Sequence, residues 1–144
     1  MEIIANQIQT VAVNQNVLFT DTVVKCNKYM SHREGSGLIT LRGNRGCECQ
    51  CNAPARYLVT FSGNIAVPTG QTVGPISLSI SNNGEPIAST TMIVTPAAVD
   101  EYFNVAGSVY IDAPYNCCTT VSAENTSTIP INVQNANLIA VRTA

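Results

Sequence analysis

Residues 76–84, with the sequence ISLSISNNG, alternate apolar and serine side chains and then end in a turn sequence. Successive side chains of a β-strand point to opposite faces, so Ile76, Leu78 and Ile80 are expected on one face and the serines on the other. Asn and Gly tolerate the positive φ that a two-residue hairpin turn needs. The stretch therefore predicts a half-buried strand over residues 76–81 that is closed by a hairpin turn at residues 82–84.

The same alternation recurs on both sides of this stretch, and Gly, Pro and Asn break it at short intervals. Val, Ile and Thr are abundant, and such β-branched side chains pack well on a pleated surface. No helix longer than one turn, at residues 97–101, is predicted. Regular strands with turn residues between them predict an all-β sandwich or jelly roll of eight to ten strands, with a single domain over residues 1–144. The further strands are predicted at residues 8–13, 17–20, 38–41, 56–67, 91–95, 102–112, 119–124 and 131–141.

The composition excludes several classes of function. Of the 144 residues, 45% are hydrophobic and 11% are charged, and the net charge of −2 disfavours a general electrostatic grip on nucleic acid or an anionic membrane. No apolar run approaches the length of a membrane span, and residues 1–6 do not resemble a signal peptide. So few charged residues suggest that part of the surface does not face solvent, and this favours oligomerisation. Residues 1–7 are interpreted as an N-terminal anchor or arm.

Cys47, Cys49 and Cys51 form a dense cysteine cluster, CECQC. In an extended strand their three thiols would share one face, and Cys26, the Cys117–Cys118 pair or His32 could add a fourth ligand for zinc. The spacing departs from that of zinc knuckles. A disulfide, with Cys26 as one partner, and free thiols are the two other interpretations, and all three stay open. For Cys117–Cys118, the alternatives are small semi-buried thiols or a strained vicinal disulfide.

Candidate catalytic groups are few. His32 is the single histidine, and neither a nucleophile elbow nor an arrangement of serine, histidine and aspartate surrounds it. The acidic residues are scattered singly, so they form neither a glycosidase pair nor a calcium loop. The sequence therefore predicts a protein that is not an enzyme and that has no cofactor beyond zinc at the cysteine cluster. His32 is interpreted as a loop or interface histidine.

Six of the seven basic residues fall between positions 25 and 56, where only Glu34 and Glu48 oppose them. One interpretation is a set of solvated loops at one end of the sandwich. The other is a basic docking face for an acidic partner protein, since a patch of one sign steers association and sets partner choice.

Several segments resemble the trimeric jelly-roll domains of the C1q/TNF-like superfamily. They are the strand at residues 57–61, the hairpin at residues 79–86, and residues 121–127 followed by the apolar strand at residues 133–141. A narrower resemblance is to small structural proteins of bacteriophages and prophages of gut Firmicutes. It rests on HREGSG at residues 32–37, FSGNIAVPTG at 61–70, IVTPAA at 93–98 and INVQNANLI at 131–139.

By this resemblance the chain would be a ten-stranded antiparallel jelly roll that assembles as a tight homotrimer. The inner sheet around the threefold axis would use strands near residues 8–20, 56–66, 102–112 and 131–141. Phe103, Val105, Val109 and Ile111 would fill the sandwich, while the opposite side of that strand would meet neighbouring subunits. The candidate interface residues are Tyr57, Tyr102, Asn104, Ala106, Tyr110 and Leu138.

The function that this resemblance implies is structural: a trimeric capsid decoration, or a fibre or knob protein of a phage virion. Its partners would be further copies of itself and other virion proteins, assembled in the host cytoplasm. The alternative is a receptor- or glycan-binding tip, or a spore-surface domain, that attaches to a host glycan or protein. The chain has no Trp, the side chain that sugar sites favour most, and no collagen-like stalk.

Overall fold

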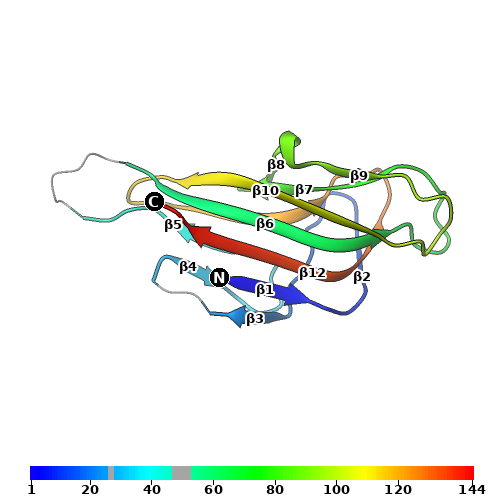
Figure 1. The fold of residues 1–144 in the computed structure, drawn as a ribbon, viewed down its shortest axis with the longest axis horizontal. Helices are drawn as coiled ribbons and strands as arrows, with labels where there is room; N and C mark the ends of the chain where they lie inside the picture. The colour runs from blue at the N-terminus through cyan, green and yellow to red at the C-terminus, as the bar shows by residue number, and fades with distance from the viewer. Residues whose placement is uncertain (26–27, 47–52) are drawn as a thin grey trace.

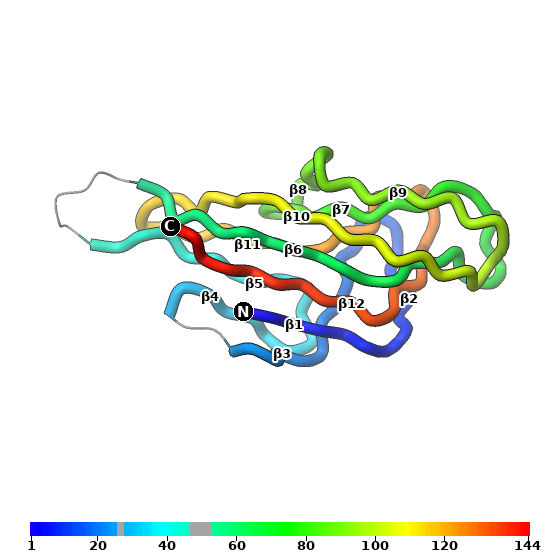
Figure 2. The backbone as a smooth tube through the Cα atoms, viewed as in Figure 1, coloured from blue at the N-terminus to red at the C-terminus, as the bar shows by residue number. Residues whose placement is uncertain are grey.

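The protein folds into two antiparallel β-sheets packed face to face, and the computed structural model describes residues 1–25, 28–46 and 53–144. Sheet I contains, in spatial order, β10 (Phe103–Ala113), β6 (Ala55–Ala66), β12 (Ile131–Arg142), β1 (Glu2–Ala5) and β3 (Asp21–Val24), with β2 (Gln9–Val11) beside β12. Sheet II contains β4 (Met30–His32), β5 (Ile39–Arg42), β11 (Cys118–Asn125), β7 (Ile76–Asn82) and β8 (Glu85–Pro86), with β9 (Met92–Val94) beside β7. Figure 1 and Figure 2 show the strands running along the long axis of the molecule.

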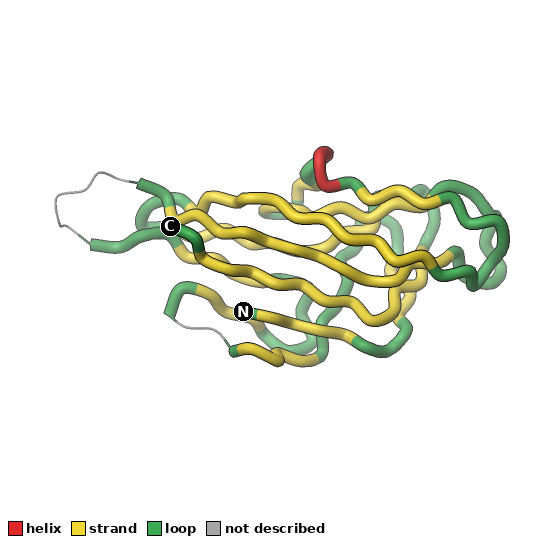
Figure 3. Tube along the Cα trace, in the orientation of Figure 1, coloured by secondary structure: helices red, strands yellow, loops and turns green. Residues whose placement is uncertain are grey.

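The predicted all-β jelly roll is confirmed, with twelve strands in the described part of the chain. Strands fill the body of the molecule in Figure 3, and the described residues include one short 3-10 turn, η1 (Ala88–Thr90), at one edge. Among the described residues there is no helix long and apolar enough to cross a membrane. Asn83 and Gly84 both take positive φ, 51° and 82°, so the hairpin turn predicted after residue 81 is confirmed.

The core lies between the sheets and is made by every second residue of the long strands. On β6, Tyr57, Val59 and Phe61 are fully buried, and they belong to the same apolar cluster as Leu78 and Ile80 of β7. Burying one such side chain stabilises a fold by about 1.5–3 kcal/mol. The alternation that predicted the strands is therefore also the pattern that holds the two layers together.

Short strands are where the structure departs from the sequence prediction. Residues 2–5, interpreted as part of an arm, form β1 between β12 and β3, and Ile3 is fully buried. β3 lies at residues 21–24 instead of 17–20, and β4 at residues 30–32 was not predicted. Strands of three or four residues contain too few alternations to stand out, and their position is decided by the longer strands beside them.

Two further expectations about side-chain placement are corrected. Phe103, expected inside the sandwich, is 37% exposed because it begins β10 at the rim of the sheet. Ser79 and Ser81, expected on a solvent-facing side of the strand, have no exposed surface. The Ser81 hydroxyl donates a hydrogen bond to Glu124 Oε2 at 2.6 Å, and the Ser79 and Thr91 hydroxyls bond at 2.9 Å. Neighbouring polar side chains thus cover both serines.

Candidate functional site

The side of sheet I that faces away from the core is a broad polar and apolar surface, here called the outer face of sheet I. Its residues alternate along each strand with the buried core residues. Tyr110 lies opposite Leu58, and Leu58 lies opposite Val141, so these three side chains form an apolar row across β10, β6 and β12. The members of the face are Asn104, Ala106, Ser108 and Tyr110 of β10; Leu58, Thr60, Ser62 and Asn64 of β6; and Gln134, Asn137, Ile139 and Val141 of β12.

The outer face of sheet I combines exposed apolar side chains with uncharged polar ones. Tyr110 is 63% exposed and Val141 is 49% exposed, while Leu58 and Ile139 are half-buried. Beside the apolar row, Ser108 lies opposite Thr60, and Thr60 lies opposite Ile139. The apolar row lies beside Arg56 and Asp112 at one end of the face, and Glu2 of β1 lies opposite Ile139. Exposed apolar side chains beside uncharged polar ones on β10, β6 and β12 are typical of a protein–protein interface.

One ion pair marks the end of this face. The Arg56 guanidinium donates two hydrogen bonds to the Asp112 carboxylate, from Nε at 2.7 Å and from the second nitrogen at 2.8 Å. These hydrogen bonds lower the pKa of Asp112 and raise that of Arg56. An open depression of about 490 Å³ includes the pair in its lining. It is lined by Arg56, Tyr110, Asp112, Thr143 and Ala144.

Four of the six candidate interface residues lie at the surface. Asn104, Ala106 and Tyr110 are exposed on the outer face of sheet I, and Tyr102, just before β10, is half-buried. Tyr57 and Leu138 are corrected: both are fully buried and point into the core. The Tyr57 hydroxyl donates to the Arg42 carbonyl oxygen at 2.5 Å, inside the protein. Neither side chain can line an interface between subunits.

Four of the six cysteines lie in the parts of the chain that the structure does not describe. Cys26, Cys47, Cys49 and Cys51 lie outside the described residues, so the zinc and disulfide interpretations remain predictions. Cys117 and Cys118 are free and exposed, so the vicinal disulfide is wrong. Within the three described ranges, His, Cys, Asp and Glu side chains do not gather in groups of three that could hold a metal ion.

His32 has both ring nitrogens engaged in the fold. Nε2 lies 3.0 Å from the Ser36 carbonyl oxygen and Nδ1 lies 2.9 Å from the Thr22 hydroxyl. A carbonyl oxygen only accepts, so Nε2 carries a proton, and in the neutral ring Nδ1 then accepts from Thr22. The ring ties the end of β4 to β3 and to the following turn, and as a metal ligand it would have to give up one of these contacts.

A second surface feature is a cavity of about 260 Å³ lined by Lys28, Tyr29, Arg42, Gly43 and Arg45, here called the cationic pocket. The Arg142 guanidinium lies over the Tyr29 ring, 4.0 Å from its centre, and Lys28 Nζ lies 5.0 Å from the same centre. The clustering of basic residues between positions 25 and 56 indicated a basic surface. The contribution of Arg142, nearly a hundred residues away, had no sequence signal.

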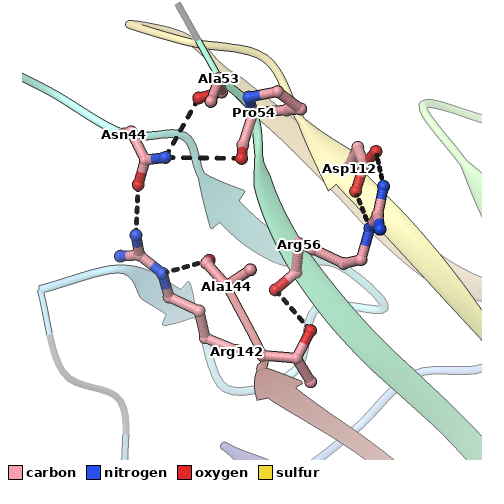
Figure 4. A network of polar contacts seen from close by, with 8 residues as sticks. Asn44, Ala53, Pro54, Arg56, Asp112, Arg142 and Ala144 are labelled. Carbon is pink, nitrogen blue, oxygen red and sulfur yellow. Dashed lines mark hydrogen bonds and ion pairs between the residues drawn. The ribbon is translucent and has the colours of Figure 1, made fainter. Parts of the chain in front are cut away.

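Arg142 is held in place by the end of the sandwich, as Figure 4 shows. Its Nε donates to the Ala144 carbonyl oxygen at 2.9 Å, and its terminal nitrogen donates to the Asn44 side-chain oxygen. The Asn44 amide in turn donates to the carbonyl oxygens of Ala53 at 3.1 Å and Pro54 at 3.4 Å. This network joins the end of β12 to the segments that follow β5 and precede β6.

Comparison with solved structures defines the class of fold to which these features belong. The globular domain of zebrafish complement 1qA matches with a TM-score of 0.64 over 97% of this chain and 93% of that chain, at 15% sequence identity. The chain therefore has the jelly-roll fold of the C1q globular domain. At this identity the likeness shows the fold alone.

Two other matches have lower TM-scores and do not extend that assignment. The C-terminal domain of EclA, a sugar-binding protein, has a TM-score of 0.42 at 13% identity, covering 95% of this chain and 79% of that one. The xylan-binding domain CBM22-1 of Xyn10C from Paenibacillus barcinonensis has a TM-score of 0.35 at 11% identity, covering 99% and 87%. No family model and no curated protein matches the sequence.

Proposed function

We propose that this protein is a non-catalytic structural domain of a phage virion, a capsid decoration or fibre knob, that works as a homotrimer. Three copies would pack the outer faces of sheet I around a common axis. The observation that carries this proposal is the apolar row of Tyr110, Leu58 and Val141, in which Tyr110 and Val141 are exposed and which continues along β10, β6 and β12 into uncharged polar side chains.

The dimensions of the face suit such an interface. β10 and β12 are 11 and 12 residues long, and strands rise about 3.3 Å per residue with neighbours about 4.8 Å apart. The face therefore offers several hundred Å² per subunit, the scale on which stable interfaces of about 800 Å² per partner are built. Covering Tyr110 and Val141 removes apolar surface from water, at about 25 cal/mol per Å².

The polar groups of the face are also compatible with burial against a second copy. Asn137 Nδ2 donates to Glu2 Oε1 at 2.6 Å, and Asn104 Nδ2 donates to Asn64 Oδ1 at 3.2 Å. Part of the polar surface is thus already paired within the subunit. Burial then leaves fewer unpaired groups, and each such group would otherwise cost roughly 1–3 kcal/mol.

The test is stoichiometric binding of the purified protein to phage capsids assembled without it, compared with binding to host cells and to a glycan array. Saturable capsid binding in multiples of three, with no retention on cells or glycans, supports the virion role. Binding to cells or to a glycan, with none to capsids, would replace it by the receptor-binding alternative. Retention on all surfaces alike would contradict both roles.

A further inference from the structure

The cationic pocket lies apart from the outer face of sheet I and is used by neither the core nor the proposed trimer. Among the described residues that line it, Lys28, Arg42 and Arg45 are cations. Arg142, whose guanidinium lies over the Tyr29 ring, adds a fourth positive charge. The positive charges come from three separate segments, so the fold itself brings them to one place.

The cations of the pocket have no acidic partner in the described part of the chain. Across residues 1–25, 28–46 and 53–144 the one salt bridge is that between Arg56 and Asp112. Glu and Asp are absent from the described residues that line the pocket. The positive charge lowers the pKa of the Tyr29 phenol. The Lys28 hydrogen bond contributes most, the charges of Lys28 and Arg142 add to it, and burial acts in the opposite direction.

The wall of the pocket is rigidly placed. Gly43 donates from its backbone N–H to the Cys117 carbonyl oxygen at 2.9 Å, and a Cβ at position 43 would stand 1.7 Å from the Pro114 carbonyl oxygen. Only glycine fits this approach of two backbones. The neighbouring backbone of Asn44 accepts from Asn116 N–H at 2.9 Å. Arg42 and Arg45 therefore project from a segment that is fixed against the start of β11.

We propose that the cationic pocket is a binding site for a phosphate group carried by a small ligand. Guanidinium groups present paired N–H donors that match phosphate oxygens, and an ammonium adds a compact positive charge. Arg42 and Arg45 would supply the paired donors and Lys28 the single charge. Arg142 stays bound to Asn44 and Ala144 and packs over the Tyr29 ring.

The size of the pocket limits the ligand. Sites for drug-sized molecules measure roughly 300–1,000 Å³, and this pocket has about 260 Å³. It therefore suits the phosphate itself and a small adjoining group, with the rest of the ligand outside.

The experiment is calorimetric titration of the purified protein with inorganic pyrophosphate at low salt, with inorganic sulfate as a second probe. We expect saturable binding at one site per chain, and weaker binding of the less highly charged sulfate. The double variant Arg42→Gln/Arg45→Gln should lose roughly tenfold or more in affinity, because charge-assisted hydrogen bonds are lost. The matched control is Arg33→Gln, because Arg33 lines a separate depression with His32 and Glu34.

A second measurement keeps the test valid if the double variant does not fold. Bound pyrophosphate places negative charge near the Tyr29 phenol and disfavours the phenolate, so the pKa of Tyr29 should rise. The change is followed by the absorbance of tyrosinate on titration, with Tyr29→Phe to identify the signal. An equal loss of affinity in Arg33→Gln, absence of saturation, or an unchanged Tyr29 titration would each overturn the assignment.

Discussion

Sheet I and sheet II each turn one face away from the core, and the two faces differ in how their side chains are used. On sheet II, Ser79, Ser81, Ser122 and Glu124 point away from the core, yet each is buried among its neighbours. On sheet I, Tyr110 is 63% exposed and Val141 is 49% exposed in a face of similar strand geometry. The serines and Glu124 of sheet II are covered within the subunit, although Ile93 of β9 on the same face is 66% exposed. The apolar row of sheet I is left open to a partner.

The largest effect that would sharpen this comparison is loss of assembly. The double substitution Tyr110→Glu/Val141→Glu puts two charges in the apolar row, and burying unpaired charges is costly. We expect the mass measured by light scattering to fall to that of one 15.3 kDa chain. The control is Ile93→Glu, since Ile93 is 66% exposed on β9 of sheet II and should leave the mass unchanged. Equal dissociation by the control variant would break the distinction between the faces.

A smaller effect, on stability alone, is expected on the outer side of sheet II. Glu124 is 7% exposed and accepts the hydrogen bond of the buried Ser81 hydroxyl at 2.6 Å. Glu124→Ala leaves that hydroxyl without its partner and should lower the free energy of unfolding by about 1–3 kcal/mol. Chemical denaturation measures this, with the exposed Glu85→Ala on β8 as control. An unchanged stability would show that the serines of sheet II do not depend on Glu124.

On the same side of sheet II, substitution of Ser122 should change the free energy of unfolding in the opposite direction. Its hydroxyl oxygen is buried without a hydrogen-bond partner, so removal of the hydroxyl relieves a desolvated polar group. We expect Ser122→Ala to keep the assembly intact and to leave the stability unchanged or raise it by up to about 1 kcal/mol. A clear loss of stability would mean that this hydroxyl has a partner in solution.

The smallest expected effect concerns the rim of sheet I. The Arg56 hydrogen bonds lower the pKa of Asp112, so the pair is present above the ordinary pKa of aspartate and is lost as the pH falls through the lowered value. In Arg56→Gln the pKa of Asp112 should rise toward its ordinary range. Carboxyl-carbon NMR across an acid titration follows this change. An Asp112 titration that is the same in both proteins would show that the pair does not form in solution.

Sequence alternation was sufficient for the long strands and insufficient for the interface residues. On β6, Tyr57 has the same parity as Val59 and Phe61, so the pattern itself places it in the core and not at an interface. On β12, the register shift between Gln134 and Asn137 exchanges the two faces partway along the strand. Leu138 could not be assigned to a face before that bulge was seen.

The cationic pocket shows a different limit of the sequence. Lys28, Arg42 and Arg45 lie near one another along the chain, and their excess charge was visible. The fold places these three residues around Tyr29. Arg142 joins them because β12 ends nearby, which brings its guanidinium over the ring. Such contacts between distant segments follow from the sheet order, which alternation alone does not determine.

The most direct test of the central claim is the solution mass of the unmodified protein by light scattering on a sizing column, over a dilution series. The proposed homotrimer around the outer face of sheet I predicts three times 15.3 kDa, the same in plain buffer, in reductant and in chelator. A single 15.3 kDa species at every concentration would contradict the assignment of the outer face of sheet I as the surface between subunits.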